Sequence, residues 1–165
     1  MDYLWTPWRY QYVNQNSDEQ RCVLCEMAQA DVRHDPEHLI FHRARHNYLV
    51  LNRYPYTTGH CMIVPYAHVG DLNSATTETL TEMALLARDL ERALEANYHP
   101  NGYNLGINIG RSAGAGIDRH LHLHVLPRWA GDTNFMTVTA ETRVLPEDLS
   151  TTYKKLAPFF TSKVG

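Results

Sequence analysis

This chain of 165 residues lacks an excess of positive charge, a long apolar run and an even set of cysteines. Its formal net charge of -3 gives no broad positive field for a nucleic-acid backbone. No apolar run reaches the roughly 18 residues that a membrane helix needs, and the start of the chain does not resemble a secretory signal. We therefore expect a cytoplasmic protein that binds neither a nucleic acid polymer nor a membrane.

The three cysteines are Cys22, Cys25 and Cys61, and only the first two lie close together. An odd number with one close pair does not describe a disulfide framework, so we expect reduced thiols. Cys61 lies in an apolar run and is interpreted as a core residue. The pair alone is compatible with redox-active, structural or incidental thiols.

The chain has no repeat, low-complexity tract or linker, which predicts a single domain over residues 1–165. An aromatic N-terminal extension covers residues 1–21, and we expect it to pack on the core or on a subunit partner. A C-terminal extension covers residues 136–165. It contains a predicted helix with Pro146-Glu-Asp148 in its first turn and Lys154-Lys155 in its last.

Patterning between these extensions predicts an alternation of strands with one long helix. Apolar residues recur at three- and four-residue steps over 75–97, which indicates an amphipathic helix that Ser74 caps. A short helix is predicted over 22–30, and strands over 39–41, 48–52, 60–64, 103–109 and 120–126. This order predicts an α+β domain with an antiparallel sheet of about five strands.

Three histidines, His120, His122 and His124, alternate with apolar residues in the last of these strands. Side chains two apart on a strand share a face, so the three imidazoles should project together. Such a face is costly to bury without partners. The spacing alone leaves two interpretations: a zinc site with an open position, or a nucleophile with its electrostatic helpers. The glycine-rich loop 110–116 favours phosphate chemistry, because its amides can approach an anion closely.

The segment His120-Leu-His-Leu-His-Val-Leu126 resembles the signature of the histidine-triad (HIT) superfamily of nucleotide hydrolases and transferases. The resemblance extends from Cys22-x-x-Cys25 through Leu51-Asn-Arg-Tyr-Pro-x-x-x-Gly-His60 and Val64-Pro-x-x-His68 to Leu126-Pro-Arg128. It implies a HIT-like fold with a long amphipathic helix and a C-terminal helix, and it implies a homodimer.

The resemblance also implies roles for individual residues. His122 would attack the α-phosphorus to form a nucleotidyl-histidine, and His124 would hydrogen-bond the phosphoryl oxygens. Asn52 matches the residue that holds the ribose hydroxyls, although a turn-forming Asn is an equal alternative. The residues expected around the phosphates are Asn108, Ser112, Gly114, Ala115, Gly116 and His120. No cofactor is needed for this chemistry, and His60 is given no catalytic role.

A structural zinc site is a further implication of the resemblance. Some bacterial relatives hold zinc through a cysteine pair and two histidines, which match Cys22, Cys25, His68 and His120 here. His120 would then be structural rather than catalytic. Related branches lack this site, so unliganded thiols are the alternative.

The residues before the triad depart from the hydrolase branches, which typically have Gln-Ser/Thr-Val-x where this chain has Gly116-Ile-Asp-Arg119. Loss of the Gln and Ser/Thr side chains favours a dinucleoside polyphosphate over a phosphoramidate as the substrate, because a polyphosphate is a good leaving group. The loop and its flanks resemble a bacterial branch of diadenosine tetraphosphate phosphorylases, similar to ATP adenylyltransferases. There inorganic phosphate takes AMP from the histidine, giving ADP and ATP-type products.

Three alternatives to a phosphorylase stay open from the sequence. The first is a hydrolase of dinucleoside polyphosphates or nucleoside phosphoramidates within the same family. The second is a nucleotide-binding regulatory protein that keeps the fold but turns over slowly. The third is a metal-dependent hydrolase with zinc on the triad itself.

Overall fold

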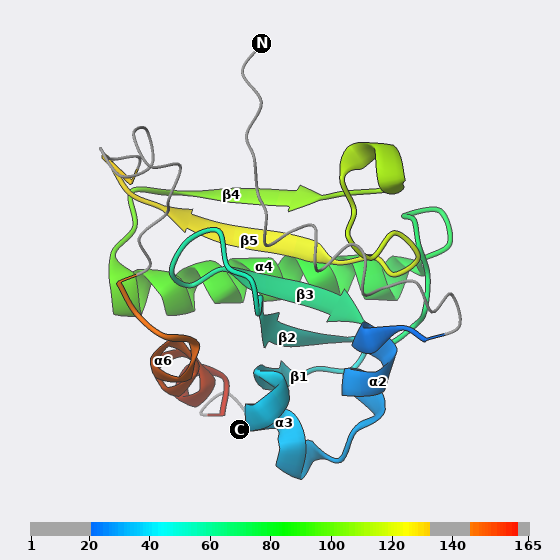
Figure 1. Ribbon diagram of the computed structural model, residues 1–165, viewed down its shortest axis with the longest axis horizontal. Helices are drawn as coiled ribbons and strands as arrows, with labels where there is room; N and C mark the ends of the chain where they lie inside the picture. Colours follow the sequence, from blue (N-terminus) through cyan, green and yellow to red (C-terminus); the bar gives the residue numbers. More distant parts are fainter. Residues whose placement is uncertain (1–20, 133–145, 162–165) are drawn as a thin grey trace.

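The computed structural model describes residues 21–132 and 146–161 and contains one five-stranded antiparallel sheet (Figure 1). The strands are β1 (Ile40–Arg43), β2 (Asn47–Leu51), β3 (Cys61–Pro65), β4 (Gly102–Ile107) and β5 (Leu123–Arg128). Their order across the sheet is β1-β2-β3-β5-β4, so β5 lies between β3 and β4. The predicted α+β class and five-stranded sheet are confirmed. Among the described residues, no helix has the length and apolar character to cross a membrane.

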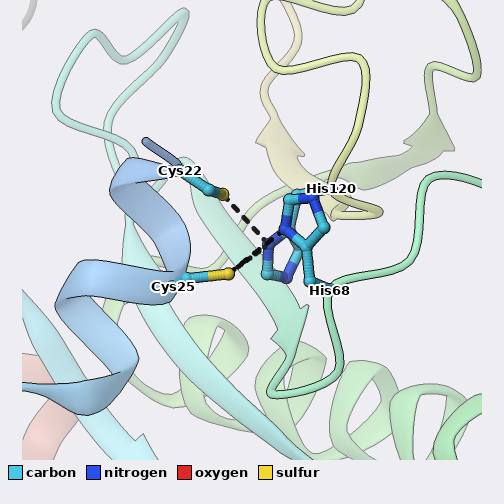
Figure 2. Close-up of side chains that lie close together, drawn as sticks. All are labelled: Cys22, Cys25, His68 and His120. Atoms are coloured by element: carbon cyan, nitrogen blue, oxygen red, sulfur yellow. Dashed lines mark hydrogen bonds between the residues drawn. The ribbon is translucent and has the colours of Figure 1, made fainter. Parts of the chain in front are cut away.

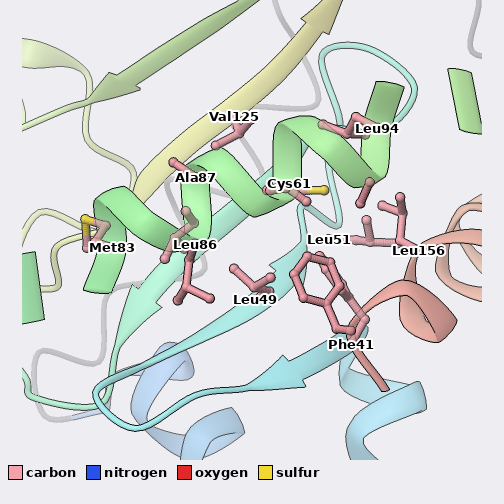
Figure 3. Packing of buried hydrophobic residues seen from close by; sticks show 14 of the residues in the cluster. Phe41, Leu49, Leu51, Cys61, Met83, Leu86, Ala87, Leu94, Val125 and Leu156 are labelled. Carbon is pink, nitrogen blue, oxygen red and sulfur yellow. The ribbon is translucent and has the colours of Figure 1, made fainter. Parts of the chain in front are cut away.

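Helix α4 (Thr77–Tyr98) packs against one face of the sheet and forms the main core there (Figure 3). Leu90 and Leu94 are fully buried against the sheet residues Leu49 and Ile63. The three- and four-residue periodicity in the sequence produces this apolar stripe. Helix α6 (Leu149–Thr161) closes one end of the core, where the Phe160 ring lies 5.6 Å from Phe41 on β1.

A smaller core lies on the opposite face of the sheet, beneath the short helix α2 (Val23–Gln29). Leu24 of this helix packs with Tyr48, Val50 and Val64 of β2 and β3. The 3-10 helix η1 (Val32–His34) and helix α3 (Asp35–His38) then lead into β1. Because α2 packs on β2 and β3, it lies beside His120, the first residue of the triad segment (residues 120–126).

Two helix ends differ from the sequence-based expectation. The N-cap of α4 is Thr76, whose hydroxyl accepts the Thr79 amide, because Ser74 is held in a preceding turn by Asp71. Helix α6 begins at Leu149 rather than at Pro146, and Asp148 accepts the Thr151 amide as a cap. Lys154 and Lys155 therefore lie in the middle of α6, which continues to bury Phe160.

The triad segment is only partly inside a regular strand. Strand β5 begins at Leu123, so His120 and His122 precede it, whereas the sequence predicted a strand from His120. The Leu121 amide donates to the Val69 carbonyl, which holds this segment to the loop after β3. Leu121 and Val125 still face the main core, so the histidines project from the other face.

Candidate functional site

His122 is buried, and one of its ring nitrogens is already occupied. Its Nδ1 lies 2.8 Å from the backbone carbonyl oxygen of His120, which can only accept a hydrogen bond. This contact assigns the proton of the neutral ring to Nδ1 and leaves a lone pair on Nε2. Burial lowers the pKa of His122 below its ordinary value, while the bond to the His120 carbonyl opposes that shift. The ring is therefore a neutral base with its lone pair on Nε2.

His124 is oriented by His60, which lies on the neighbouring strand end. The Tyr56 amide donates to His60 Nδ1 at 3.1 Å, so the His60 proton lies on Nε2. That Nε2 is 2.9 Å from His124 Nδ1 and donates to it. His124 then carries its own proton on Nε2. The His122 and His124 rings meet edge to face with their centroids 4.8 Å apart.

His60 is the third histidine of this network, although the sequence analysis assigned it no catalytic role. Burial, followed by repulsion from His124 and His122, lowers its pKa to about 3. The Tyr56 ring stacks on it with centroids 5.0 Å apart. The pairing of Met62 with His124 in the sheet brings His60 to the triad face. This register joins segments 62 residues apart, so the family resemblance could place His60 near the site, but only the structure shows which histidine it contacts.

His120 turns away from these residues and joins the cysteine pair of α2 (Figure 2). Its Nδ1 lies 3.2 Å from Cys22 Sγ and 3.4 Å from Cys25 Sγ, and Cys25 Sγ lies 3.2 Å from His68 Nδ1. The ligand atoms of all four residues lie within 4.8 Å of one another. The predicted metal-ligating set is thus brought together from α2, the loop after β3 and the triad segment.

The donor set and its spacing fit a tetrahedral zinc ion. Zinc bonds to sulfur and nitrogen imply ligand–ligand separations of roughly 3.3–3.8 Å, which the three sulfur–nitrogen distances approach. His120 Nε2 donates to the Pro65 carbonyl at 2.9 Å, which assigns Nδ1 as the free ligand atom. Burial, followed by its hydrogen bond with Cys22, raises the pKa of the Cys25 thiol to about 11. A metal that binds the thiolate would reverse that tendency.

The glycine-rich loop forms a compact turn between β4 and the triad segment. The 3-10 helix η2 (Arg111–Ala113) is followed by Gly114, whose φ of 82° lies in the left-handed region. The Gly114 amide donates to the Arg111 carbonyl within the turn. Arg111 also pairs with Asp118 at 2.7 Å, so the acidic residue that departs from the hydrolase pattern closes this loop. Ser112 and Gly116 are exposed, and Ala115 is half-buried.

The two predicted asparagines lie at strand ends. Asn52 follows β2, and its side-chain oxygen accepts the Tyr54 amide at 2.9 Å, so it does form a turn. Its amide nitrogen lies 3.4 Å from His60 Nε2, next to the histidine network. Asn108 follows β4 and is half-buried. Their predicted ligand contacts stay predictions.

Comparisons with known proteins agree with this geometry. A model of the HIT domain matches residues 33–131. The chain belongs to the HIT family. A HIT relative from Mycobacterium tuberculosis, named AP-4-A phosphorylase, is 36% identical over 159 residues, which cover 93% of this chain and 82% of that protein.

Solved structures of HIT proteins also resemble this fold. A zinc-bound histidine triad family protein from Mycobacterium smegmatis has a TM-score of 0.68 and 28% identity, with 86% of this chain and 94% of that chain covered. A hypothetical histidine triad nucleotide-binding protein from Sulfolobus tokodaii has a TM-score of 0.67 and 24% identity, with 86% and 93% covered. The expected superfamily and fold are therefore confirmed.

Proposed function

We propose that this HIT protein is a dinucleoside polyphosphate phosphorylase that transfers a nucleoside monophosphate through His122. The observation that carries the proposal is the bond from His122 Nδ1 to the His120 carbonyl, because it leaves Nε2 as a bare nucleophile. The name of the M. tuberculosis relative supports diadenosine tetraphosphate as the substrate. No cofactor takes part in this chemistry.

In the first step, His122 Nε2 attacks the α-phosphorus of diadenosine tetraphosphate. A nitrogen–phosphorus bond forms, the bond from the α-phosphorus to its bridging oxygen breaks, and ATP leaves. His124 carries a proton on Nε2, as the His60 contact assigns, and can donate it to a phosphoryl oxygen. Both histidines are thus held in complementary states before substrate arrives.

In the second step, inorganic phosphate attacks the nucleotidyl-histidine and releases ADP, which restores His122. Loop residues Ser112 and Gly116 are exposed and near the triad in sequence, in keeping with a phosphate site there. Asn52 and Asn108 are proposed to hold the ribose and the phosphates. The nearest alternative is hydrolysis, in which water replaces phosphate and AMP is released.

The test is to incubate the pure protein with diadenosine tetraphosphate, with and without inorganic phosphate, and to identify products by chromatography. A phosphorylase gives ADP and ATP only when phosphate is present. AMP and ATP in the absence of phosphate would make the protein a hydrolase. Tight nucleotide binding with no product in either condition would favour the regulatory alternative.

We also propose that Cys22, Cys25, His68 and His120 hold a structural zinc ion. The support is the convergence of four ligand atoms and the zinc-bound relative from M. smegmatis. Zinc would supply a cross-link between α2 and the triad segment, not a Lewis acid for the reaction. This assignment places His120 in the metal site and removes the reason for zinc on the triad as a catalytic ion. Metal analysis of the purified protein tests it.

A homodimer is proposed from the edge of the sheet. Strand β4 is an edge strand, and the apolar side chains of Leu105 and Ile109 are exposed on it and just after it. Pairing of two β4 edges would cover both. Sedimentation of the wild type and of a Leu105→Lys variant tests this, because a β4 interface requires the variant to be monomeric.

A further inference from the structure

Helix α2 supplies two of the four proposed zinc ligands but is too short to stand alone. It has seven residues, whereas isolated helices shorter than about 12 residues are marginal in water. Cys22 is its N-cap residue and Cys25 lies in its first turn. The positions of both sulfurs therefore depend on what holds the helix against the rest of the fold.

Arg43 of β1 holds the C-terminal end of this helix. Its Nη1 donates to the Ala28 carbonyl at 2.6 Å, and its Nη2 donates to the Met27 and Ala30 carbonyls at 3.2 and 3.4 Å. The last carbonyls of a helix lack partners within it, and a cation there interacts favourably with the helix dipole. One guanidinium thus binds the whole end of α2 to the sheet.

Asp35 in turn fixes the guanidinium. Arg43 Nε lies 2.9 Å from Asp35 Oδ2, and Nη2 lies 2.7 Å from Oδ1. Both side chains are largely buried, with 19% and 17% of their surfaces exposed. This two-point contact leaves the guanidinium little freedom to turn away from the helix. Tyr48 adds a second anchor, because its hydroxyl donates to the Leu24 carbonyl at 2.8 Å.

Arg33 provides a contrast within the same region. It makes a similar two-point contact with Asp31, but the side chains are 82% and 46% exposed. Within the part of the chain that the structure describes, its hydrogen bonds run to Asp31 and not to α2. An exposed pair of this kind contributes little. Removal of either arginine deletes one cation, and only Arg43 touches the metal-binding helix.

We propose that Arg43 is a positioning residue for the metal site. It holds α2 on β1 so that Cys22 and Cys25 face His68 and His120 before the ion binds. The inference rests on the proposed structural zinc. Its consequence is that zinc affinity depends on a residue that contributes no ligand atom.

The test is a zinc titration of the full chain in competition with a chromophoric chelator, for the wild type, Arg43→Ala, Arg43→Lys and Arg33→Ala. Outer partners of metal ligands typically alter affinity by about 10- to 100-fold, so Arg43→Ala should bind zinc at least about tenfold more weakly. Arg43→Lys should also weaken binding, because an ammonium cannot reproduce the fork. Arg33→Ala should stay within about twofold of the wild type.

Hydrogen exchange of the metal-free proteins separates positioning from general destabilisation. The proposal expects faster exchange over residues 23–29 in Arg43→Ala, with the amides of α4 still protected. If Arg43→Ala does not fold, Arg43→Lys carries the test. Unchanged zinc affinity in the folded Arg43 variants would overturn the proposal and leave the zinc site standing. Absence of zinc binding by the wild type would overturn both.

Discussion

Two histidines separated by one residue, His120 and His122, lie in environments that give them different chemistry. The His120 ring faces two cysteines and a second histidine, with its other nitrogen bonded to the Pro65 carbonyl. The His122 ring instead contacts the His120 carbonyl and lies beside the His124 ring. The difference shows that a repeated residue takes its role from what the rest of the fold brings to it.

The His120 and His122 rings are nevertheless linked through the backbone carbonyl of His120. The His120 side chain belongs to the proposed metal site, and its backbone carbonyl accepts the proton of His122 Nδ1. A shift of His120 should therefore disturb the nucleophile as well.

The largest effect is expected from His122→Ala, which removes the proposed nucleophile and should lower kcat by at least about a thousandfold. Nucleotide binding, measured by calorimetry, should stay detectable because the loop and asparagines are intact. Wild-type protein denatured at alkaline pH, where a phosphorus–nitrogen bond to imidazole is stable, should carry a nucleotidyl group on His122, seen by mass spectrometry. Substantial turnover by the variant would assign the nucleophile to another residue.

Cys25→Ser removes one of the four proposed zinc ligands and should abolish stoichiometric zinc binding. Because His120 then loses a restraint, kcat should fall by about 10- to 100-fold while KM changes little. Cys61→Ala is the matched control, since Cys61 is buried outside the cluster and its loss should leave zinc content unchanged. Full activity of metal-free Cys25→Ser would show that the proposed zinc site does not influence the reactivity of His122.

His60→Gln should reduce turnover, because it removes the imidazole that fixes the tautomer of His124. We expect kcat to fall by about tenfold, in line with a single lost orienting contact, while zinc content stays at the wild-type level. Steady-state kinetics and metal analysis on the same sample check this. A loss of zinc in His60→Gln would mean that the two networks are not separate.

The smallest effect concerns stability against acid. The pKa of His60 is about 3 in the folded protein and near 6.5 when unfolded, so only the unfolded chain gains this proton between those values. Folding stability should therefore decrease as pH falls from about 6.5 toward 3. His60→Gln should make that decrease shallower without abolishing it, because burial also lowers the pKa of His122. Denaturant unfolding of both proteins across this range measures the slopes, and equal slopes would contradict the assignment.

Much of the fold could be predicted because local patterns determine its elements. The apolar stripe from Leu80 to Leu94 defines α4, and alternation places Leu121 and Val125 in the core. Helix ends were less predictable, since Thr76 rather than Ser74 became the cap only because Asp71 holds the preceding turn. The predictions for residues 1–20 and 133–145 lie outside the described residues.

By itself the sequence determined the family, the α+β class and the identity of the triad, because these depend on short motifs and on periodicity along the chain. Only the tertiary structure decided which of the three histidines faces the cysteines and which two lie side by side. The tautomers of His122 and His124 depend on the His120 carbonyl and on His60, and the convergence of the proposed zinc ligands depends on where α2 packs against the sheet. These contacts join segments distant in sequence, and hydrogen-bond direction depends on positions in space that no linear spacing encodes.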